Sequence, residues 1–295
     1  MKKKNHFAKG HRGRTLFVLF NTLLMSFLMI IMVGPLLKVL VDSLDPTATY
    51  GMRLIPKAIN FGAYRYIMGT SALYRPFLVS IGTTMVGTFL GLTITTIAAY
   101  VIIQKNMPGN KFFIYMILLT MLFNGGLIPT YITIKSFGLL SSVSGSLLAV
   151  LLPIGLNAYN ITLMKSFFEG IPSSLLEAAE IDGYSPLGIF MKIVLPLSKP
   201  ALASVGLFIA VSVWNDFFNF TIYVSDSKWR NFQVKVRELI LNDALSSNTT
   251  EATGGLSAEM MKSATIIVVM APFLLIYPFL QKYFVKGITL GAVKG

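Results

Sequence analysis

The chain has 295 residues, of which 54% are apolar and only 13% are charged, and its mean hydropathy is +0.70. Soluble domains carry about 25% charged residues, so this composition excludes a globular protein in water and indicates one that lies in lipid. The net charge of +13 is explained by basic residues beside anionic lipid rather than by nucleic-acid binding, and the absence of cysteine excludes disulfides, cysteine-ligated metals and thiol chemistry.

Residues 1–14 form a basic tail with six lysine and arginine residues. The apolar run Thr15–Leu40 follows it. This run is too long for a signal peptide and has no small-residue cleavage site after it, so it predicts a retained transmembrane helix. Crossing a bilayer core of about 30 Å takes about 20 apolar residues. Five later runs are long enough: Pro76–Ile103, Phe112–Ile132, Ser142–Met164, Pro200–Val224 and Ser263–Phe284.

The six runs are continuous rather than alternating, which indicates helices and not a β-barrel. The third run is the weakest, because Asn124-Gly125-Gly126 and Pro129 interrupt its outer end. If residues 1–14 are cytoplasmic, 14 lysine and arginine residues lie inside and nine outside, as the positive-inside rule favours. We therefore predict an all-α integral membrane protein with six transmembrane helices and both termini in the cytoplasm.

The loop at 165–199 is a long cytoplasmic connection, and long loops tend to carry function. Pro172 and the serines after it suit a helix start, and Gly183 suits the left-handed position that ends a helix. Ser185-Pro186 suits a second start, and Leu195-Pro196 is expected to stop that helix. The pattern predicts two short helices joined by a sharp turn. Taken alone, it fits an interfacial amphipathic loop as well as a partner-docking element.

This loop also contains a specific string. Glu177-Ala178-Ala179 is followed after three residues by Gly183 and after nine more by Ile193-Val194-Leu195-Pro196. The string resembles the EAA motif of permease subunits of ABC importers at every position and spacing, in the expected cytoplasmic loop. Tyr184 stands where that family often has a small residue, which puts only the packing of the turn in doubt.

The resemblance extends over nearly the whole chain. It is closest to the carbohydrate branch, to the smaller permease of maltose-type systems and to the subgroup for breakdown products of complex oligosaccharides and polysaccharides. The strings that carry it are Phe123–Tyr131, Trp214–Asn219 and Lys286–Gly295. It implies that residues 15–295 form the transmembrane domain of a type I ABC importer in a bacterial plasma (inner) membrane.

The resemblance also implies how such a chain is driven. The loop would dock in a groove of a cytoplasmic ATPase, with Glu177 facing basic groups there. The implied coupling residues are Glu177, Ala178, Ala179, Asp182, Gly183, Leu195 and Pro196. No Gly-Lys dipeptide occurs, which rules out a P-loop, so ATP and Mg are expected on the partner and no cofactor or metal on this chain. The expected assembly is a heterodimer with a second permease, two ATPase subunits and an extracellular solute-binding protein.

Asp216 is the only acidic residue inside a predicted span, so it should face a cavity or a partner. Either it lines a path for the oligosaccharide or it caps or pairs locally near the outer helix end. Aromatic faces stack on sugar rings and amides bind hydroxyls. The candidate path residues are Asn124, Trp214, Asn215, Asp216, Phe218 and Asn219.

The external loop at 225–262 is either a simple connector or, as the resemblance implies, the contact with the solute-binding protein. Trp229, Gln233 and Arg237 are the candidate contact residues. Gly87 and Gly91, four residues apart in the second run with Gly82 before them, are expected to serve close helix packing rather than chemistry.

Two other classes of membrane protein, and a different solute within the same class, are the alternatives to this interpretation. A membrane-embedded enzyme would need a catalytic constellation, and the two histidines, His6 and His11, lie in the basic tail. A secondary transporter would carry several titratable groups in its spans and would leave the EAA string unexplained. An ABC importer of a non-sugar solute, such as a peptide or a glycerol phosphodiester, stays open.

Overall fold

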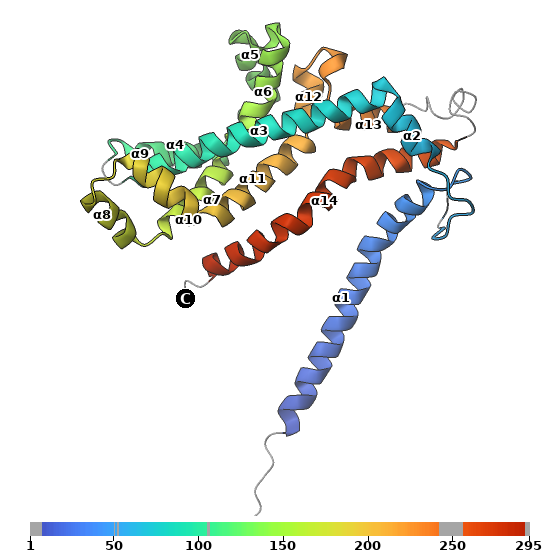
Figure 1. Cartoon of the computed structure of the whole chain (residues 1–295), viewed down its shortest axis with the longest axis horizontal. Coiled ribbons are helices and arrows are strands. Elements are labelled where there is room, and N and C mark those ends of the chain that lie inside the picture. The colour runs from blue at the N-terminus through green and yellow to red at the C-terminus, as the bar shows by residue number, and fades with distance from the viewer. Residues whose placement is uncertain (1–7, 50, 52, 105–106, 242–255, 293–295) are drawn as a thin grey trace, which may run out of the picture. The chain divides into compact units, whose positions relative to one another are not determined.

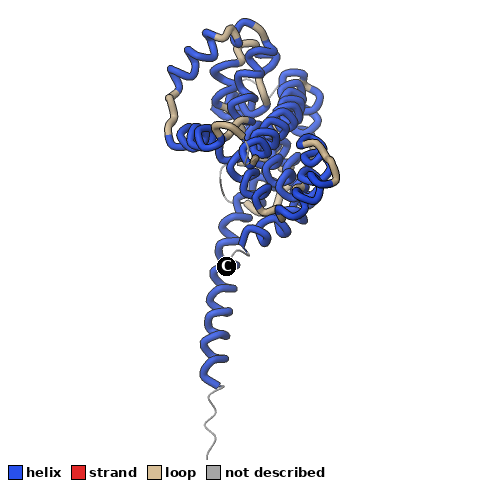
Figure 2. The backbone as a smooth tube through the Cα atoms, turned by 90° about the vertical axis from the view of Figure 1, so that its left-hand side faces the viewer, coloured by secondary structure: helices blue, strands red, loops and turns tan. Residues whose placement is uncertain are grey.

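The computed structural model describes residues 8–49, 51, 53–104, 107–241 and 256–292, and over these residues it is helical without a strand (Figure 2). The chain divides into two compact units. One comprises Met1–Gly69 with Leu239–Val269, and the other comprises Thr70–Glu238 with Met270–Gly295. The predicted all-α class is confirmed for the described residues. The boundary between a tail at 1–14 and a membrane domain at 15–295 stays a prediction.

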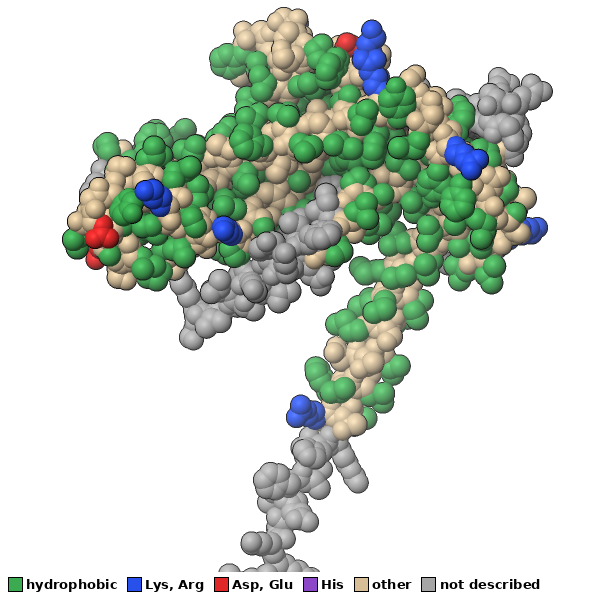
Figure 3. Space-filling view, viewed as in Figure 1, with side chains coloured by type: hydrophobic (Ala, Val, Ile, Leu, Met, Phe, Trp, Pro, Cys, Tyr) green, Lys and Arg blue, Asp and Glu red, His purple; other side chains and the backbone are tan. Residues whose placement is uncertain are grey.

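The first unit is built on α1, Ala8–Asp42, a single long helix (Figure 1). Its large apolar side chains from Leu16 to Leu40 are almost all exposed, and Figure 3 shows them along the length of the helix. A helix that is apolar all round requires lipid or other helices as its surroundings. This matches the predicted first span.

The segment after α1 is folded around Asp45. One carboxylate oxygen of Asp45 accepts the backbone N–H of Thr47 (2.8 Å) and its hydroxyl (2.7 Å), and the other accepts the backbone N–H of Lys57 (2.9 Å). These bonds, that of Lys57 first, lower the pKa of Asp45 below its ordinary value. Ser43 shares a 2.7 Å hydrogen bond with Tyr64 of α2, Gly62–Gly69. Hydrogen bonds of side chains therefore hold the segment between α1 and α2, where the chain forms no helix.

The second unit is organised around α3, Ser71–Ile103 (Figure 1). It packs along α11, Lys199–Trp214, and against α6, Val143–Gly155, and α7, Ala158–Glu169. The side chains at the centre of this bundle are fully buried, among them Val150, Met164, Val205 and Ile209.

Glycines set how closely α3 and α6 approach. A Cβ atom on Gly91 would lie 2.6 Å from the Cα of Gly155, and one on Gly87 would lie 2.9 Å from Leu151. Next to this crossing, Thr95 donates a 3.0 Å hydrogen bond to the carbonyl of Gly155. The packing role predicted for Gly87 and Gly91 is confirmed, whereas for Gly82 it is wrong, because nothing lies within 4 Å of a Cβ atom added there.

Three of the predicted spans contain breaks. The third is divided into α4, Asn110–Leu122, and α5, Leu127–Ser136. The fourth is divided into α6 and α7, which are bent by 47° at a junction where Asn157 caps α7. The fifth is divided into α11 and α12, Phe218–Tyr223. The break in the third run lies at the predicted Asn124-Gly125-Gly126 interruption. The breaks in the fourth and fifth runs were not predicted, and there Asn157 and Asp216 accept a backbone N–H group of the helix that follows.

In the part of the chain that the structure describes, two helical stretches are each long and apolar enough to cross a membrane: Gly13–Asp42 and Leu73–Ile103. Two bent pairs, α6 with α7 and Pro186–Leu197 with Lys199–Trp214, would raise this to four. The sixth predicted run lies within α14, Ala258–Ala292. Six crossings and two cytoplasmic termini stay predictions.

Candidate functional site

The predicted cytoplasmic loop begins with α8, Ser173–Ile181, which ends in a tight hydrogen-bonded turn. Gly183 adopts φ +80° and donates to the carbonyl of Glu180, while Tyr184 donates to the carbonyl of Ala179, both at 3.0 Å. This pair of bonds is the Schellman motif, which favours glycine because a Cβ is strained at positive φ. The predicted helix end at Gly183 is confirmed, and Tyr184 fits the turn without displacing it.

One residue of α8 faces the protein and most of the others face outward. Ala179 is 4% exposed and belongs to the buried core, whereas Ile181 is 88% exposed. Other exposed side chains of this loop are Leu175, Glu177, Ala178, Glu180, Asp182, Tyr184 and Leu187. A surface that mixes large apolar side chains with carboxylates at the end of the bundle is typical of a partner-binding site.

Tyr100, near the end of α3, attaches the loop to the bundle. Its hydroxyl donates a 2.9 Å hydrogen bond to the carbonyl of Pro186, and its ring lies 4.7 Å from the ring of Phe190. On the loop itself, the Lys192 ammonium lies 4.9 Å from the centre of the Tyr184 ring. The turn after α8 is thereby tied to the central helix of the unit.

The helix after the turn does not stop at Leu195-Pro196. It runs as α9, Pro186–Ile189, then a π-helical turn, Phe190–Val194, then α10, Leu195–Leu197, and the bend of 81° comes after it, at Ser198. Pro196 has no N–H to donate, and the wider π turn leaves room for its ring. The predicted stop is corrected to Ser198, and Leu195 and Pro196 lie at the base of the loop rather than on α8.

The candidate path residues gather where α11 ends and α12 begins. One carboxylate oxygen of Asp216 accepts both the backbone N–H and the side-chain amide of Asn219, each at 3.2 Å, and thereby caps α12. Its other oxygen is buried without a hydrogen-bond partner in the described structure. Phe218 is exposed beside them. Asp216 therefore caps α12 through one carboxylate oxygen, and its other oxygen has no hydrogen-bond partner among the described residues.

The next helix, α13, Phe232–Leu241, lies against this junction. Its N-terminal segment and two of its side chains make the contacts: Asn231 donates to the carbonyl of Asp216, Gln233 donates to the side-chain oxygen of Asn215 at 3.4 Å, and the Arg237 guanidinium lies 4.3 Å from the Phe217 ring centre. Residues predicted for the sugar path and residues predicted for the solute-binding protein are thus brought together in one cluster.

The remaining candidates are placed differently. Trp214 is 3% exposed and meets Phe77 edge-on, with ring centres 6.0 Å apart. Trp229 is partly exposed on a short 3₁₀ turn, Ser227–Trp229. Asn124 lies in the break between α4 and α5, where it accepts the N–H of Gly126, and no hydrogen bond between described residues joins it to the junction.

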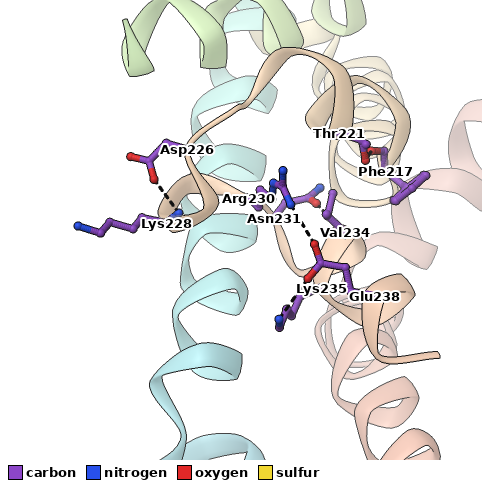
Figure 4. A network of polar contacts seen from close by, with 9 residues as sticks. All are labelled: Phe217, Thr221, Asp226, Lys228, Arg230, Asn231, Val234, Lys235 and Glu238. Carbon is purple, nitrogen blue, oxygen red and sulfur yellow. Dashed lines mark hydrogen bonds and ion pairs between the residues drawn. The ribbon is translucent and has the colours of Figure 1, made fainter. Parts of the chain in front are cut away.

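A pocket of about 320 Å³ opens on the other side of α13. The first turns of α3, the 3₁₀ turn and α13 form its walls (Figure 4). Its charged lining residues are Arg75, Lys228, Arg230, Lys235 and Glu238. Sequence reasoning assigned no role to this pocket, because the start of α3 is far in the chain from the 3₁₀ turn and α13.

Two further residues of the site were missed for the same reason. Tyr100 lies 86 positions from Pro186, and Asn231 lies 15 positions from Asp216, so no local pattern signals either contact. Asn231 is 1% exposed, and its side-chain oxygen also accepts the N–H of Val234. Among described residues, no group of three or more histidine, aspartate or glutamate side chains could hold a metal ion.

Comparisons with known proteins agree on one family. Residues 111–290 match the model of the binding-protein-dependent transport system inner membrane component. The polygalacturonan/rhamnogalacturonan transport system permease protein YtcP of Bacillus subtilis is 39% identical over 94% of this chain and 99% of that protein. Protein LplC of the same organism is 36% identical over 98% and 99%.

One solved structure is also similar over most of its length. It is the crystal structure of a bacterial ABC transporter involved in the import of the acidic polysaccharide alginate. The TM-score is 0.83 at 29% identity, and the match covers 92% of this chain and 98% of that one. The likeness therefore extends over most of both chains and is not limited to a single motif.

Proposed function

Since the chain belongs to the family of binding-protein-dependent transport system inner membrane components, as a permease subunit of an ABC importer for carbohydrates, we propose that α8 couples it to a separate cytoplasmic ATPase. We also propose that the junction between α11 and α12 contacts the sugar in transit. The family places the chain in the inner membrane, and its relatives are transport components rather than enzymes.

The exposed surface of α8 is the observation that carries the coupling proposal. Ile181 and Leu187 are 88% and 69% exposed, although both are large and apolar. The carboxylates of Glu177 and Asp182 are exposed in the same loop, so the surface suits a groove with an apolar floor and basic edges. Such a groove on the ATPase would bury the apolar side chains and pair the carboxylates.

A physical route from this surface into the bundle supports the same proposal. The turn after α8 is bonded to Tyr100 of α3, and α3 packs along α11 and against α6 and α7. A movement of α8 driven by the ATPase would be passed to α3 through that hydrogen bond and the Phe190 ring. This is how a remote nucleotide site can bias two states of a membrane pore.

The names of the relatives indicate the substrate. One relative serves polygalacturonan and rhamnogalacturonan, and the similar solved structure serves alginate. We propose that this chain translocates oligosaccharide fragments of such polysaccharides, delivered by an extracellular solute-binding protein that contacts Trp229, Gln233 and Arg237. The full assembly would contain a second, different permease subunit and two ATPase subunits, which would hold ATP and Mg.

The coupling proposal is tested by purification of the tagged chain in mild detergent with identification of co-purifying proteins by mass. Wild type should bring down a second permease and an ATPase, and Glu177→Lys should lose the ATPase but keep the second permease. Lys135→Glu, a charge reversal of equal size at an exposed position of α5, should behave as wild type. Retention of the ATPase by Glu177→Lys would contradict the assignment.

A further inference from the structure

The pocket beside α13 carries more positive than negative charge. Four cationic side chains line it, Arg75, Lys228, Arg230 and Lys235, against one carboxylate, that of Glu238. The carboxylate is shared, because Arg230 donates to one of its oxygens at 3.0 Å and Lys235 to the other at 3.1 Å (Figure 4). The single carboxylate of Glu238 thus pairs with two cations, and the pocket has an excess of positive charge.

Several donors in the pocket have no acceptor. The Nε of Arg230 is buried without a hydrogen-bond partner in the described structure. Lys228 extends away from Glu238 (Figure 4), and neither Lys228 nor Arg75 makes an ion pair with a described residue. The nearby Asp226 carboxylate is bonded to the backbone N–H of Lys228 at 2.9 Å. Buried or clustered cationic donors without acceptors favour an anion that supplies them.

The pocket and the candidate sugar path lie against two different faces of the same helix, α13. Val234, Lys235 and Glu238 of α13 line the pocket, whereas Gln233 and Arg237 contact the junction at Asn215 and Phe217. At 100° per residue, these two sets lie on separate faces of α13. A ligand in the pocket therefore lies against a different face of α13 from the face that contacts the junction.

We infer that this pocket binds the carboxylate of an acidic oligosaccharide, a chain of uronate units, as the sugar passes between the solute-binding protein and the junction. The inference rests on the proposed function and adds to it a binding site for the acidic groups of the sugar. Guanidinium groups bind carboxylates through paired hydrogen bonds, and the exposed Arg75 side chain, which makes no ion pair with a described residue, provides one such group. Ligand pockets range from about 300 to 1,000 Å³, and the volume of 320 Å³ suits one sugar ring rather than a long chain.

An acidic side chain of the solute-binding protein is the competing occupant. The sugar is favoured because the pocket is concave and lies behind the amide and aromatic cluster of the junction, whose chemistry suits sugars. A protein partner would instead need apolar anchors around the charge. The pocket offers few, since Val234 and Pro76 are the only apolar side chains among its lining residues.

The test uses the complete purified complex in lipid nanodiscs, without nucleotide and without the solute-binding protein. Binding of labelled trigalacturonate is measured by equilibrium dialysis and compared with its neutral methyl ester. Wild type should bind the acid about tenfold or more tightly than the ester, as loss of one charge-assisted contact predicts. The preference should weaken as salt is raised.

The variants locate the binding. Arg75→Gln and Lys228→Gln should each lower the affinity for the acid toward that of the ester and leave the affinity for the ester unchanged. Lys135→Gln, which removes an exposed cation of α5, should keep the full preference for the acid. Co-purification of the partner subunits with each variant shows that the complex has assembled.

Three results would overturn the inference: no binding of the acid by wild type, equal binding of acid and ester, or equal losses for both ligands in Arg75→Gln. If acid binds only when the solute-binding protein is present, and the variants weaken binding of that protein with either ligand, the pocket serves the protein and the inference is also wrong. Because the measurement needs no ATPase activity, its failure is distinct from a failure of the coupling proposal.

Discussion

The hydroxyl of Tyr100 on α3 donates a 2.9 Å hydrogen bond to the carbonyl of Pro186, the first residue of the helix that follows the α8 turn. Two segments 86 residues apart are held by this bond and by the ring contact between Tyr100 and Phe190. It is a direct bonded link between the loop and the central helix of the bundle.

Tyr100→Phe should therefore uncouple the loop without unfolding the chain. The substitution removes the hydrogen bond, worth about 1 kcal/mol, and keeps the ring. We expect the ATPase still to co-purify, but the number of sugar molecules imported per ATP to fall several-fold in proteoliposomes. Tyr115→Phe, at an exposed position on α4, is the matched control. An unchanged ratio in Tyr100→Phe would show that the bond transmits nothing.

Gly91→Ala should destabilise the bundle, because the added Cβ would meet the Cα of Gly155 at 2.6 Å. Overpacking of this kind costs about 1–3 kcal/mol. Gly82→Ala on the same helix is the control, since nothing lies within 4 Å of its added Cβ. Scanning fluorimetry of the purified complex should show a lower unfolding temperature for the first variant only. Equal unfolding temperatures would mean that α3 and α6 can move apart to admit the added Cβ without a loss of stability.

The stability of the fold around Asp45 should depend on pH in the acidic range. The Lys57 N–H bond first, and the Thr47 hydroxyl bond next, lower the pKa of Asp45 in the folded state. Its ionised form therefore stabilises the fold above the unfolded pKa of about 3.9, and this contribution is lost as pH falls through the folded pKa. Asp45→Asn should unfold at a lower temperature at neutral pH, and the difference should shrink below about pH 4. A difference independent of pH would contradict this account.

Asp216 combines a cap with an unpaired oxygen, and two substitutions separate these roles. Asp216→Asn keeps the acceptor for Asn219, so stability should hold, whereas Asp216→Ala loses the cap and about 1 kcal/mol. If the second oxygen binds a sugar hydroxyl, both variants should raise the sugar concentration that half-stimulates the ATPase by several-fold. If sugar stimulates the ATPase of Asp216→Asn as it does that of wild type, Asp216 only caps α12 and does not bind the sugar.

The sequence predicted those features that follow from local chemistry. Gly183 ends α8 as expected, because only a residue free at positive φ fits that turn. The Asn124-Gly125-Gly126 interruption coincides with the end of α4. The family string at Glu177 was recognisable because its spacing is fixed by the same turn.

Features that depend on distant contacts could not be predicted. The helix continues past Pro196 because a π turn accommodates the ring, which no local rule demands. The bend at Asn157 reflects packing of α6 and α7 on α3. The contacts of Asn231 and Arg237 with the junction, and the pocket behind α13, exist only once α13 is folded against α11 and α12.

The close approach of Gly91 and Gly155 has a consequence for how such a chain can change over generations. A Cβ atom on either glycine would lie 2.6 Å from the Cα of the other, so a change to alanine at either position is disfavoured as long as the other stays in place. The two positions are therefore constrained by one and the same contact.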